Sequence, residues 1–415
     1  MSMSPSGITV IKVKTVIDGT GSTPKSHQAV VIEGDSIREI LPQDQLSFPE
    51  GTLVQTLNYP DGYLLPGLID AHAHLMFGVH GATYEEVIEN DTDEIMLLRA
   101  AKNARIHLLC GVTTLRENGA RNRITFDLRE GAERGYVTAP RLLLCGRPVT
   151  VTGGHFFWCN QEADGVEGVR AAVRQLIKEG ADHIKIMASG GGTAITDNRL
   201  PSYSVDELRA IVDETHNMGK LTTAHCLATK SITNALDAHV DMIEHAAFIE
   251  PDGSFKFDSR IVERIAKQGV YISPTVQTGY RQREELLIKE SQAPLNEPSR
   301  LRLDGLKAKC ESQLEFLRRM REEWDIDIIS GTDSIQLFGD YCLGLELMSN
   351  AGMSNQEIIT SSTSLAAQAI GVDRTVGTIS PGKCADLIVV EKDPLRDITA
   401  LRDISMVMRE GEIIN

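Results

Sequence analysis

The stretch YLLPGLIDAHAH, at residues 63–74, is an almost unbroken apolar run that ends in two histidines. Runs of this kind are typical of strands that are buried on both faces of a parallel sheet. Seven further buried runs follow it along the chain: VTTLREN (112–118), RLLLCGRPV (141–149), HIKIMAS (183–189), LTTAHC (221–226), MIEHA (242–246), VYISPTV (270–276) and DIIS (327–330).

Amphipathic helical stretches separate these runs. In one of them apolar positions recur at i, i+3, i+4 and i+7 from Leu208, and an S-x-x-E capping box begins at Ser204. Strands that alternate with helices in this way predict an α/β protein with a parallel sheet. Eight such strands predict a closed (β/α)8 TIM barrel.

Short strands separated by turn residues flank this region on both sides. They are predicted at 8–13, 29–32, 37–40 and 53–57, and again at 385–391 and 405–411. The two ends of the chain are therefore expected to form one small β-sandwich domain. The expected bounds are 1–62 and 373–415 for the sandwich and 63–372 for the catalytic barrel.

Charge and composition exclude several classes of protein. The 415 residues carry 58 acidic and 42 basic side chains, and the net charge of −16 has the wrong sign for a nucleic-acid surface. No stretch approaches the roughly 20 apolar residues of a membrane span, and the first residues lack a signal-peptide pattern. Seven cysteines, an odd number without a C-x-x-C pair, indicate a reducing compartment. We expect a cytoplasmic protein that acts on a small molecule.

The chain makes a long excursion at 277–326, after the seventh run. Its second half is rich in charged residues, which predicts a solvated helix face. The stretch that contains Pro294 and Pro298 could instead cover the site as a lid.

Residues that can bind metal ions lie at the ends of the predicted strands. His72 and His74 are two positions apart, so their side chains share one face of an extended segment. Such a pair alone is more often structural than metal-binding. Further candidates follow other runs at the same end, where active sites of this barrel class are assembled: Lys185, His225, His245 and Asp333. The whole set predicts a metal site.

The residue types in this set suit zinc, because neutral imidazoles bind the ion and a carboxylate adds charge and can accept a proton. Lys185 is the exception, since an ammonium group repels metal ions. It is either a buried ion-pair partner or a carbamate formed with CO2, which would be an anionic bridge. Other histidines are interpreted as structural: His80, His107, His183, His216 and His239.

Six motifs extend over nearly the whole chain: LPGLIDAHAHL (65–75), HIKIMASGGG (183–192), AHC (224–226), EHA (244–246), GTDS (331–334) and GTISPGKCADLIVV (377–390). Together they resemble the amidohydrolase superfamily, and within it the imidazolonepropionase-related, prolidase-like branch of metal-dependent hydrolases. The motifs are specific for the superfamily and much less specific for the substrate.

The resemblance implies a binuclear metal-dependent hydrolase. One Zn2+ ion would be held by His72, His74 and Asp333 and the second by His225 and His245, with N-carboxylated Lys185 between them. A bridging hydroxide would attack the amide or peptide C–N bond of a dipeptide or an N-acyl amino acid, and Asp333 would deliver the proton to the leaving amine. Members of the family commonly form homo-oligomers, which is the expectation here.

Two more residues are candidate site residues. His155, in TGGHFF, matches a TGGH segment of the prolidase-like branch and could support the scissile carbonyl or its oxyanion. It could equally be a loop histidine bound to backbone. Tyr203, in the loop after the lysine strand, could contact the substrate or pack against the barrel rim.

Two local features stand apart from the motifs. In LRENGA, at 115–120, Glu117 and Asn118 depart from the family pattern and leave the role of that position open. The glycines 190–192 lack the Lys-Ser/Thr of a phosphate-binding loop, which favours a flexible segment beside the metal site.

Three alternative functions remain at this point. The first is a carbamate, urea or xenobiotic amide hydrolase of the same superfamily, and the second is a mononuclear deaminase or ring hydrolase. Lys185 argues against the second, because those branches generally lack a bridging lysine. The third is an inactive scaffold protein, which would be expected to have lost some of the ligand positions that are filled here.

Overall fold

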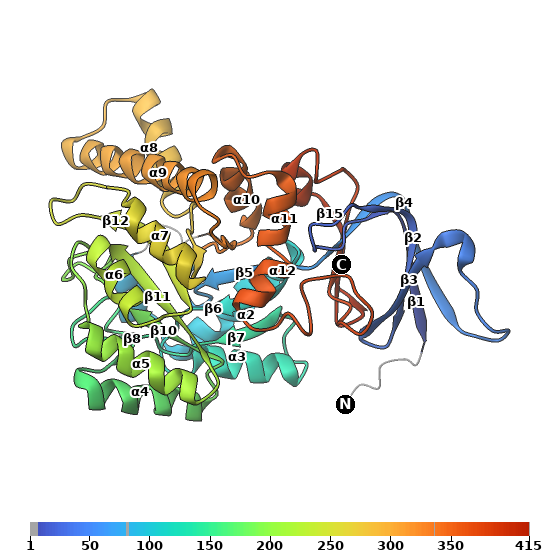
Figure 1. Cartoon of the computed structure of the whole chain (residues 1–415), viewed down its shortest axis with the longest axis horizontal. Coiled ribbons are helices and arrows are strands. Elements are labelled where there is room, and N and C mark those ends of the chain that lie inside the picture. Colours follow the sequence, from blue (N-terminus) through green and yellow to red (C-terminus); the bar gives the residue numbers. More distant parts are fainter. Residues whose placement is uncertain (1–6, 80–82, 336, 415) are drawn as a thin grey trace.

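The computed structural model describes residues 7–79, 83–335 and 337–414, which fold into an α/β structure with three sheets (Figure 1). A seven-stranded sheet lies at one end of the molecule. Two parallel sheets and most of the helices make up the other end, which carries the candidate site.

The seven-stranded sheet is built from both ends of the chain. Its strands are β1 (Ile8–Val16), β2 (Lys25–Glu33), β3 (Ser36–Pro42), β4 (Val54–Pro66), β14 (Leu387–Val390), β15 (Ile404–Arg409) and β16 (Glu412–Ile413). β14 pairs antiparallel with residues 63–66 of β4, so the two ends of the chain share one layer. The sandwich arrangement and the domain bounds that the sequence suggests stay predictions.

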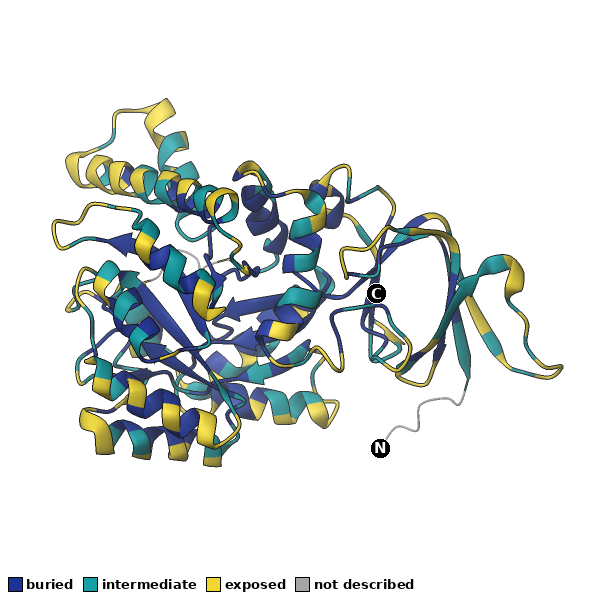
Figure 2. Cartoon of the chain, viewed as in Figure 1, coloured by how far each residue is buried: buried dark blue, intermediate teal, exposed yellow. Residues whose placement is uncertain are grey.

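Two sheets of parallel strands form the centre of the larger part. One contains β5 (Leu68–Ala73), β6 (Val112–Glu117) and β7 (Arg141–Leu144). The other runs, in spatial order, through β13 (Tyr271–Ser273), β12 (Met242–Ile249), β11 (Leu221–Ala228), β10 (His183–Met187), β8 (Val149–Thr150) and β9 (Gln161–Glu162). The strands are buried, whereas the surrounding helices expose their outer faces (Figure 2).

Helices lie between these strands, as the alternating pattern predicts. They are α2 (Asp93–Leu109), α3 (Ile124–Glu133), α4 (Gly165–Glu179), α5 (Val205–Asn217), α6 (Thr229–Asp237) and α7 (Ser259–Gln268). The capping box at the start of α5 is confirmed: the Ser204 hydroxyl accepts a hydrogen bond from the backbone N–H of Glu207, and the Glu207 carboxylate accepts one from the N–H of Ser204.

The segment at 327–334 lies between the two parallel sheets. Ile328 forms a bridge with Ile272 of β13, and the backbone N–H of Asp333 donates to the carbonyl oxygen of His72 at 2.7 Å. The sequence predicts a strand at 327–330, whereas the structure has only isolated bridges along this segment. Because the described strands form two sheets rather than one ring, the closed barrel stays a prediction.

The first apolar run contains two strands of different sheets rather than one. β4 ends at Pro66 and β5 begins at Leu68. Proline lacks the backbone N–H that a continuing ladder of hydrogen bonds needs. A Cβ on Gly67 would lie 2.0 Å from Oγ1 of Thr113 in β6, so only glycine fits at this position. The third run, 141–149, likewise divides between β7 and β8. Apolar character does not reveal either change of sheet, because both parts of each run are largely buried.

The remaining helices are α1 (Tyr84–Asn90), α8 (Tyr280–Gln292), α9 (Glu297–Glu323), α10 (Tyr341–Asn350), α11 (Asn355–Ser361) and α12 (Ser364–Ala369), with short 3-10 turns at Gln43–Gln45 and Ile398–Arg402. α8 and α9 make up most of the excursion, and Arg318 of α9 pairs with Glu315 and Glu322 on the solvated face that the sequence predicts. All seven cysteines are free. No helix in the described ranges is long and apolar enough to cross a membrane.

Candidate metal centre

The candidate ligands lie at the carboxyl ends of four parallel strands and in the segment beside them. His72 is in β5 and His74 directly follows it, Lys185 is in β10, His225 in β11 and His245 in β12, while Asp333 lies in the 327–334 segment. The register pairs Met187 with His225 and Cys226 with His245, so the later strands end at a similar level.

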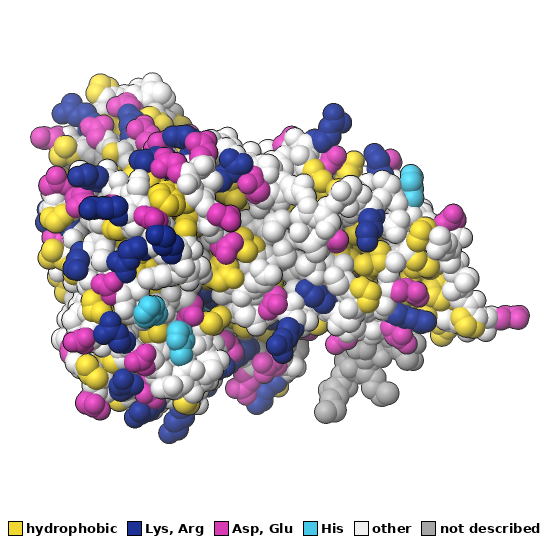
Figure 3. Space-filling model, viewed as in Figure 1, with side chains coloured by type: hydrophobic (Ala, Val, Ile, Leu, Met, Phe, Trp, Pro, Cys, Tyr) yellow, Lys and Arg dark blue, Asp and Glu magenta, His cyan; other side chains and the backbone are white. Residues whose placement is uncertain are grey.

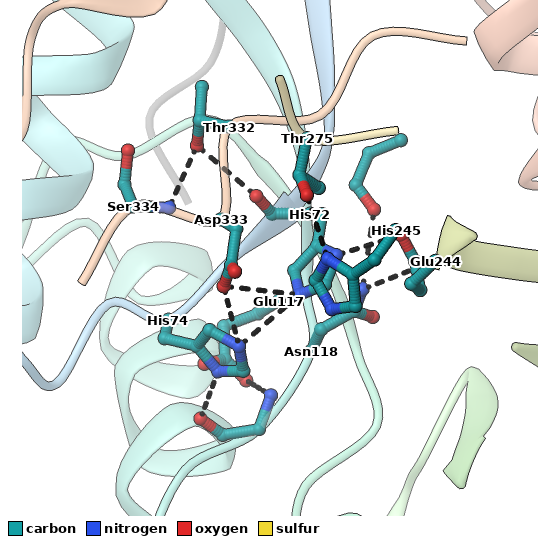
Figure 4. A network of polar contacts seen from close by, with 12 residues as sticks. His72, His74, Glu117, Asn118, Glu244, His245, Thr275, Thr332, Asp333 and Ser334 are labelled. Atoms are coloured by element: carbon teal, nitrogen blue, oxygen red, sulfur yellow. Dashed lines mark hydrogen bonds and ion pairs between the residues drawn. The ribbon is translucent and has the colours of Figure 1, made fainter. Parts of the chain in front are cut away.

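His72, His74 and Asp333 converge on one point (Figure 4). The Nε2 atoms of the two histidines are 3.3 Å apart, and Oδ1 of Asp333 lies 3.4 Å from each of them. The prediction that the two histidines share one face of an extended segment is therefore confirmed. These three side chains are the only group of at least three such ligands that the described residues bring within 4.8 Å of one another.

The outer nitrogens of both rings fix where the ring protons lie. His72 donates from Nδ1 to Oε2 of Glu244 at 2.7 Å, and His74 donates from Nδ1 to the carbonyl oxygen of Gly119 at 3.0 Å. In the neutral form each ring is then left with a lone pair on Nε2 that faces the Asp333 carboxylate; burial opposes protonation of His74, but the hydrogen bond and charge of Asp333 raise its pKa. A cation resolves this convergence of electron pairs, so the donor set suits a divalent metal ion.

His225 and His245 form a second pair close by. Their ring centroids are 4.6 Å apart, and the centroid of His245 is 5.3 Å from that of His72. Nδ1 of His245 bonds to the Thr275 hydroxyl at 2.7 Å, and Nε2 of His225 to the carbonyl oxygen of Gly190 at 3.2 Å. Burial lowers the pKa of both rings well below the usual value, so both rings are neutral at pH 7.

Lys185 is buried beside these histidines without a partner. Its side chain is 1 % exposed, and Nζ has no hydrogen-bond partner in the described part of the chain. An ion-paired lysine, one of the two interpretations of the sequence, does not match this geometry. Burial lowers the pKa of Lys185, which favours the uncharged amine that reacts with CO2.

Glu244 organises the floor of the centre, and the sequence interpretation missed it. Its carboxylate is fully buried and accepts hydrogen bonds from His72, from NH2 of Arg116 at 2.7 Å, from Asn118 at 3.1 Å and from the Thr223 hydroxyl at 2.6 Å. Burial favours a raised pKa, but His72, Lys185 and Arg116 hold the pKa of Glu244 well below the usual value. The ionised carboxylate therefore fixes His72 in the orientation that presents Nε2 to the metal centre.

The position of Glu244 breaks the usual alternation of a strand. Neighbours in a regular strand point to opposite faces, yet Glu244 contacts His72 and the ring of His245 also lies beside His72. The positive φ of His245, 71°, accounts for this because it departs from extended geometry. Asp333 (φ 51°) and Thr275 (φ 45°) are also in the left-handed region, so strained backbone gathers around the centre.

A second buried carboxylate holds the segment that carries Asp333. Asp70 accepts hydrogen bonds from the hydroxyl of Thr332 at 2.7 Å, from its backbone N–H at 3.0 Å and from the backbone N–H of His72 at 3.1 Å. These bonds tie β5 to the residue before Asp333. The two segments can lie this close because residue 331 is a glycine: a Cβ on Gly331 would lie 2.9 Å from Cβ of His72.

The unusual pair in LRENGA lies underneath the centre. Asn118 donates to Glu244 and shares a hydrogen bond of 2.9 Å with Nε2 of His183. Glu117 accepts a hydrogen bond from the backbone N–H of Gly119 at 3.1 Å, and burial raises its pKa to about 7. Both residues therefore support the ligand-bearing segments from below.

His155 reaches the edge of the centre. Its ring centroid is 4.8 Å from that of His225, and its Nδ1 lies 2.9 Å from the hydroxyl of Thr193. A Cβ on Gly191 would lie 2.4 Å from Nε2 of His155. Gly191 therefore allows the close approach of the backbone to this ring, a reason that the sequence does not reveal.

Tyr203 packs in the main hydrophobic core, where its side chain is 2 % exposed. Its hydroxyl donates to the carbonyl oxygen of Ala163 at 2.9 Å. This geometry favours the packing interpretation over substrate contact. His107 and His183 are also buried, His216 bonds to Asp241, His239 lies in a loop, and His80 is outside the described residues.

The model of the amidohydrolase family matches residues 63–414. The chain belongs to the amidohydrolase family. Ochratoxinase of Aspergillus niger is 25% identical over 447 residues, which cover 98% of this chain and 86% of that protein. Imidazolonepropionase of Shewanella woodyi is 22% identical over 397 residues, which cover 86% and 85% of the two proteins.

A solved Xaa-Pro dipeptidase with methionine in its active site has the same fold as this amidohydrolase. The TM-score is 0.85 at 25% identity, over 99% of this chain and 100% of that one. The family assignment made from the motifs is therefore confirmed, and with it the expectation of a hydrolase that acts on C–N bonds.

Replacing Glu244 by Gln should lower both stability and metal content. The change keeps the shape of the side chain but leaves Arg116 as a buried charge without its counter-ion, which costs about 3–5 kcal/mol. The free energy of unfolding in urea and the bound metal measured by mass spectrometry report the two effects. Glu250→Gln is the matched control, because Glu250 is only partly buried and its carboxylate accepts a hydrogen bond from the uncharged hydroxyl of Thr229. Equal stability and metal content in both variants would contradict the role given to Glu244.

Proposed function

We propose that this amidohydrolase is a binuclear enzyme that cleaves the amide or peptide bond of a dipeptide or an N-acyl amino acid. The observation that carries the proposal is the convergence of donor atoms from His72, His74 and Asp333 near Lys185, which is buried and has no hydrogen-bond partner for Nζ among the described residues. The names of the ochratoxinase and Xaa-Pro dipeptidase relatives support a substrate of the amide or peptide class.

The donor sets divide between two ions. His72, His74 and Asp333 would hold one ion, and His225 and His245 the other, which lies within reach because the rings of His72 and His245 are neighbours. Nitrogen and carboxylate donors are those that Zn2+ prefers. When bound, the ions supply Lewis acidity at the scissile carbonyl and lower the pKa of a coordinated water.

Lys185 would join the two ligand sets as an N6-carboxylated lysine. An uncharged amine attacks CO2 through a new N–C bond and releases one proton to solvent, and the resulting carbamate anion turns a group that repels cations into one with two oxygen donors. The absence of a partner for Nζ among the described residues supports this assignment, because a lysine that stayed charged there would lack a counter-ion in hydrogen-bond contact.

Asp333 and His155 would act on the substrate. The Asp333 carboxylate faces the centre and can hold the proton of the attacking water and pass it to the leaving nitrogen. Burial lowers the pKa of His155 to about 3, so the ring is neutral. The Thr193 hydroxyl already accepts from the backbone N–H of Phe156 and can donate to Nδ1 of His155, which places the ring proton on Nε2 as a donor for a developing oxyanion.

The two parallel sheets and the 327–334 segment are proposed to close into the (β/α)8 barrel, with the ligands at its carboxyl end. The cytoplasmic location and the homo-oligomeric state stay predictions.

Lys185→Ala should lose bound metal and hydrolytic activity, because the bridge between the two ligand sets is removed. Short-chain carboxylic acids should restore part of the activity by occupying the space of the carbamate. Metal content per chain and the rate with and without acetate are the measurements, and Lys178→Ala in the last turn of α4 is the surface control. Full metal content and an unchanged rate in Lys185→Ala would rule out the carbamate.

Asp333→Asn should retain the fold while kcat falls at least about 100-fold, since the amide cannot accept the transferred proton. The assay uses zinc- and bicarbonate-supplemented enzyme on a panel of dipeptides, N-acyl amino acids, aryl carbamates and aryl ureas. Asp325→Asn, in an exposed position, should keep the wild-type rate. Turnover of only the carbamates or ureas by the wild type would contradict the proposed substrate class. A near-normal kcat in Asp333→Asn would contradict the proton-transfer role.

A further inference from the structure

A cavity of about 400 Å³ opens beside Asp333, away from the floor formed by Glu244. One wall comes from α8 and α9, and the other from Tyr84 and residues 332–343. The stretch at 294–298, which the sequence suggests as a lid, does not line it. The two helices of the excursion contribute instead, through residues that include Gly279, Leu306 and Lys309.

Lys309 is the unpaired cation of this cavity. Its side chain is partly buried, and none of the hydrogen bonds or ion pairs between described residues involves it. A Cβ on Gly279 would lie 3.8 Å from Nζ of Lys309, which places the ammonium group against the start of α8. Lys309 and Asp333 line the same cavity, so the ammonium group shares this space with a residue of the candidate metal centre.

Two cations near Lys309 have carboxylate partners, whereas Arg302 of α9 bonds to the amide oxygen of Gln282. Arg281, also at the cavity, pairs with Asp340, and Lys307, two residues before Lys309, lies 3.9 Å from Glu290. On the face drawn in Figure 3, basic and acidic side chains are likewise interspersed over this end of the molecule. Glu285, an acidic residue at the cavity, is on the exposed side of α8. Lys309 therefore offers charge for an anion that is not part of the chain.

The opposite side of the cavity leads to aromatic rings. The ring of Tyr84 lies 5.5 Å from that of Phe77 and 5.3 Å from that of Phe156, and Phe156 in turn is 6.3 Å from His74. A lining tyrosine that belongs to an aromatic cluster beside His74, and an ammonium group in the same cavity, match a molecule with an apolar part and a negative group.

We propose that Lys309 is a specificity-determining residue that binds the free carboxylate of the amino-acid half of the substrate. This inference rests on the proposed amide hydrolysis and adds that the enzyme recognises the free carboxylate of its substrate. The carboxylate would form a charge-assisted hydrogen bond with Nζ while the scissile carbonyl lies at the metal centre beside Asp333.

The test compares two forms of the dipeptide or N-acyl amino acid that the wild type cleaves most efficiently: the free acid and its C-terminal carboxamide. Lys309→Met keeps the length of the side chain and removes its charge. Loss of one charge-assisted hydrogen bond should raise KM for the acid about 10- to 100-fold, with KM for the carboxamide unchanged. Lys309→Arg should recover much of the preference, and Lys307→Met on the same helix should behave as wild type.

Two results would overturn the assignment while leaving the proposed function in place. One is a wild type that cleaves the acid and the carboxamide with equal KM. The other is a Lys309→Met variant in which both substrates are affected equally, which would indicate a structural role. Failure of the wild type to cleave either compound, or any other amide of the panel, would instead overturn the proposed function and this inference with it.

Discussion

One buried carboxylate holds the candidate site together. Glu244 in β12 accepts hydrogen bonds from His72 in β5, from Arg116 in β6 and from Thr223 in β11, so a single side chain links four strands from both parallel sheets. Burying an ionised group is costly unless it is hydrogen-bonded, and here the carboxylate accepts three hydrogen bonds at Oε1 and one at Oε2. Its charge also decides which nitrogen of His72 carries the proton, and thereby which nitrogen faces the metal centre.

The fold places groups together that do not attract one another. The Nε2 atoms of His72 and His74 face the Asp333 carboxylate. Lys185 is buried, and its Nζ has no hydrogen-bond partner among the described residues. The backbone is also strained at His245, Thr275 and Asp333. Each of these features lowers stability by itself, and they coincide within one small volume. Metal cations bound between these donor atoms would replace their mutual repulsion by attraction. The arrangement is therefore interpreted as a candidate metal centre.

The sequence reveals the parts of this design that depend on local spacing. His72 and His74 could be placed on one face because a strand has a period of two, and the capping box at Ser204 depends on only four consecutive residues. The supporting carboxylate could not be found in this way, because alternation in a regular strand would point Glu244 and His245 to opposite faces. The positive φ that brings both to His72 is a product of tertiary packing.

The other differences between the sequence predictions and the structure also arise from tertiary packing. The change of sheet at Pro66 and Gly67 is invisible to hydropathy, since both sides are buried, and the contact of Gly191 with His155 joins residues far apart in the chain. Lys309 lies in a charged helix whose pattern indicates only a solvated face. Its lack of a partner emerges once α8 and α9 are packed over the cavity.

The most direct measurement of the central claim is anomalous X-ray diffraction at the zinc edge from crystals of zinc-loaded, active protein. A binuclear centre predicts two peaks about 3.5–4 Å apart, one beside His72, His74 and Asp333 and the other beside His225 and His245, with density for a carboxylated Lys185 between them. A single peak, or peaks away from these side chains with an unmodified Lys185, would contradict it.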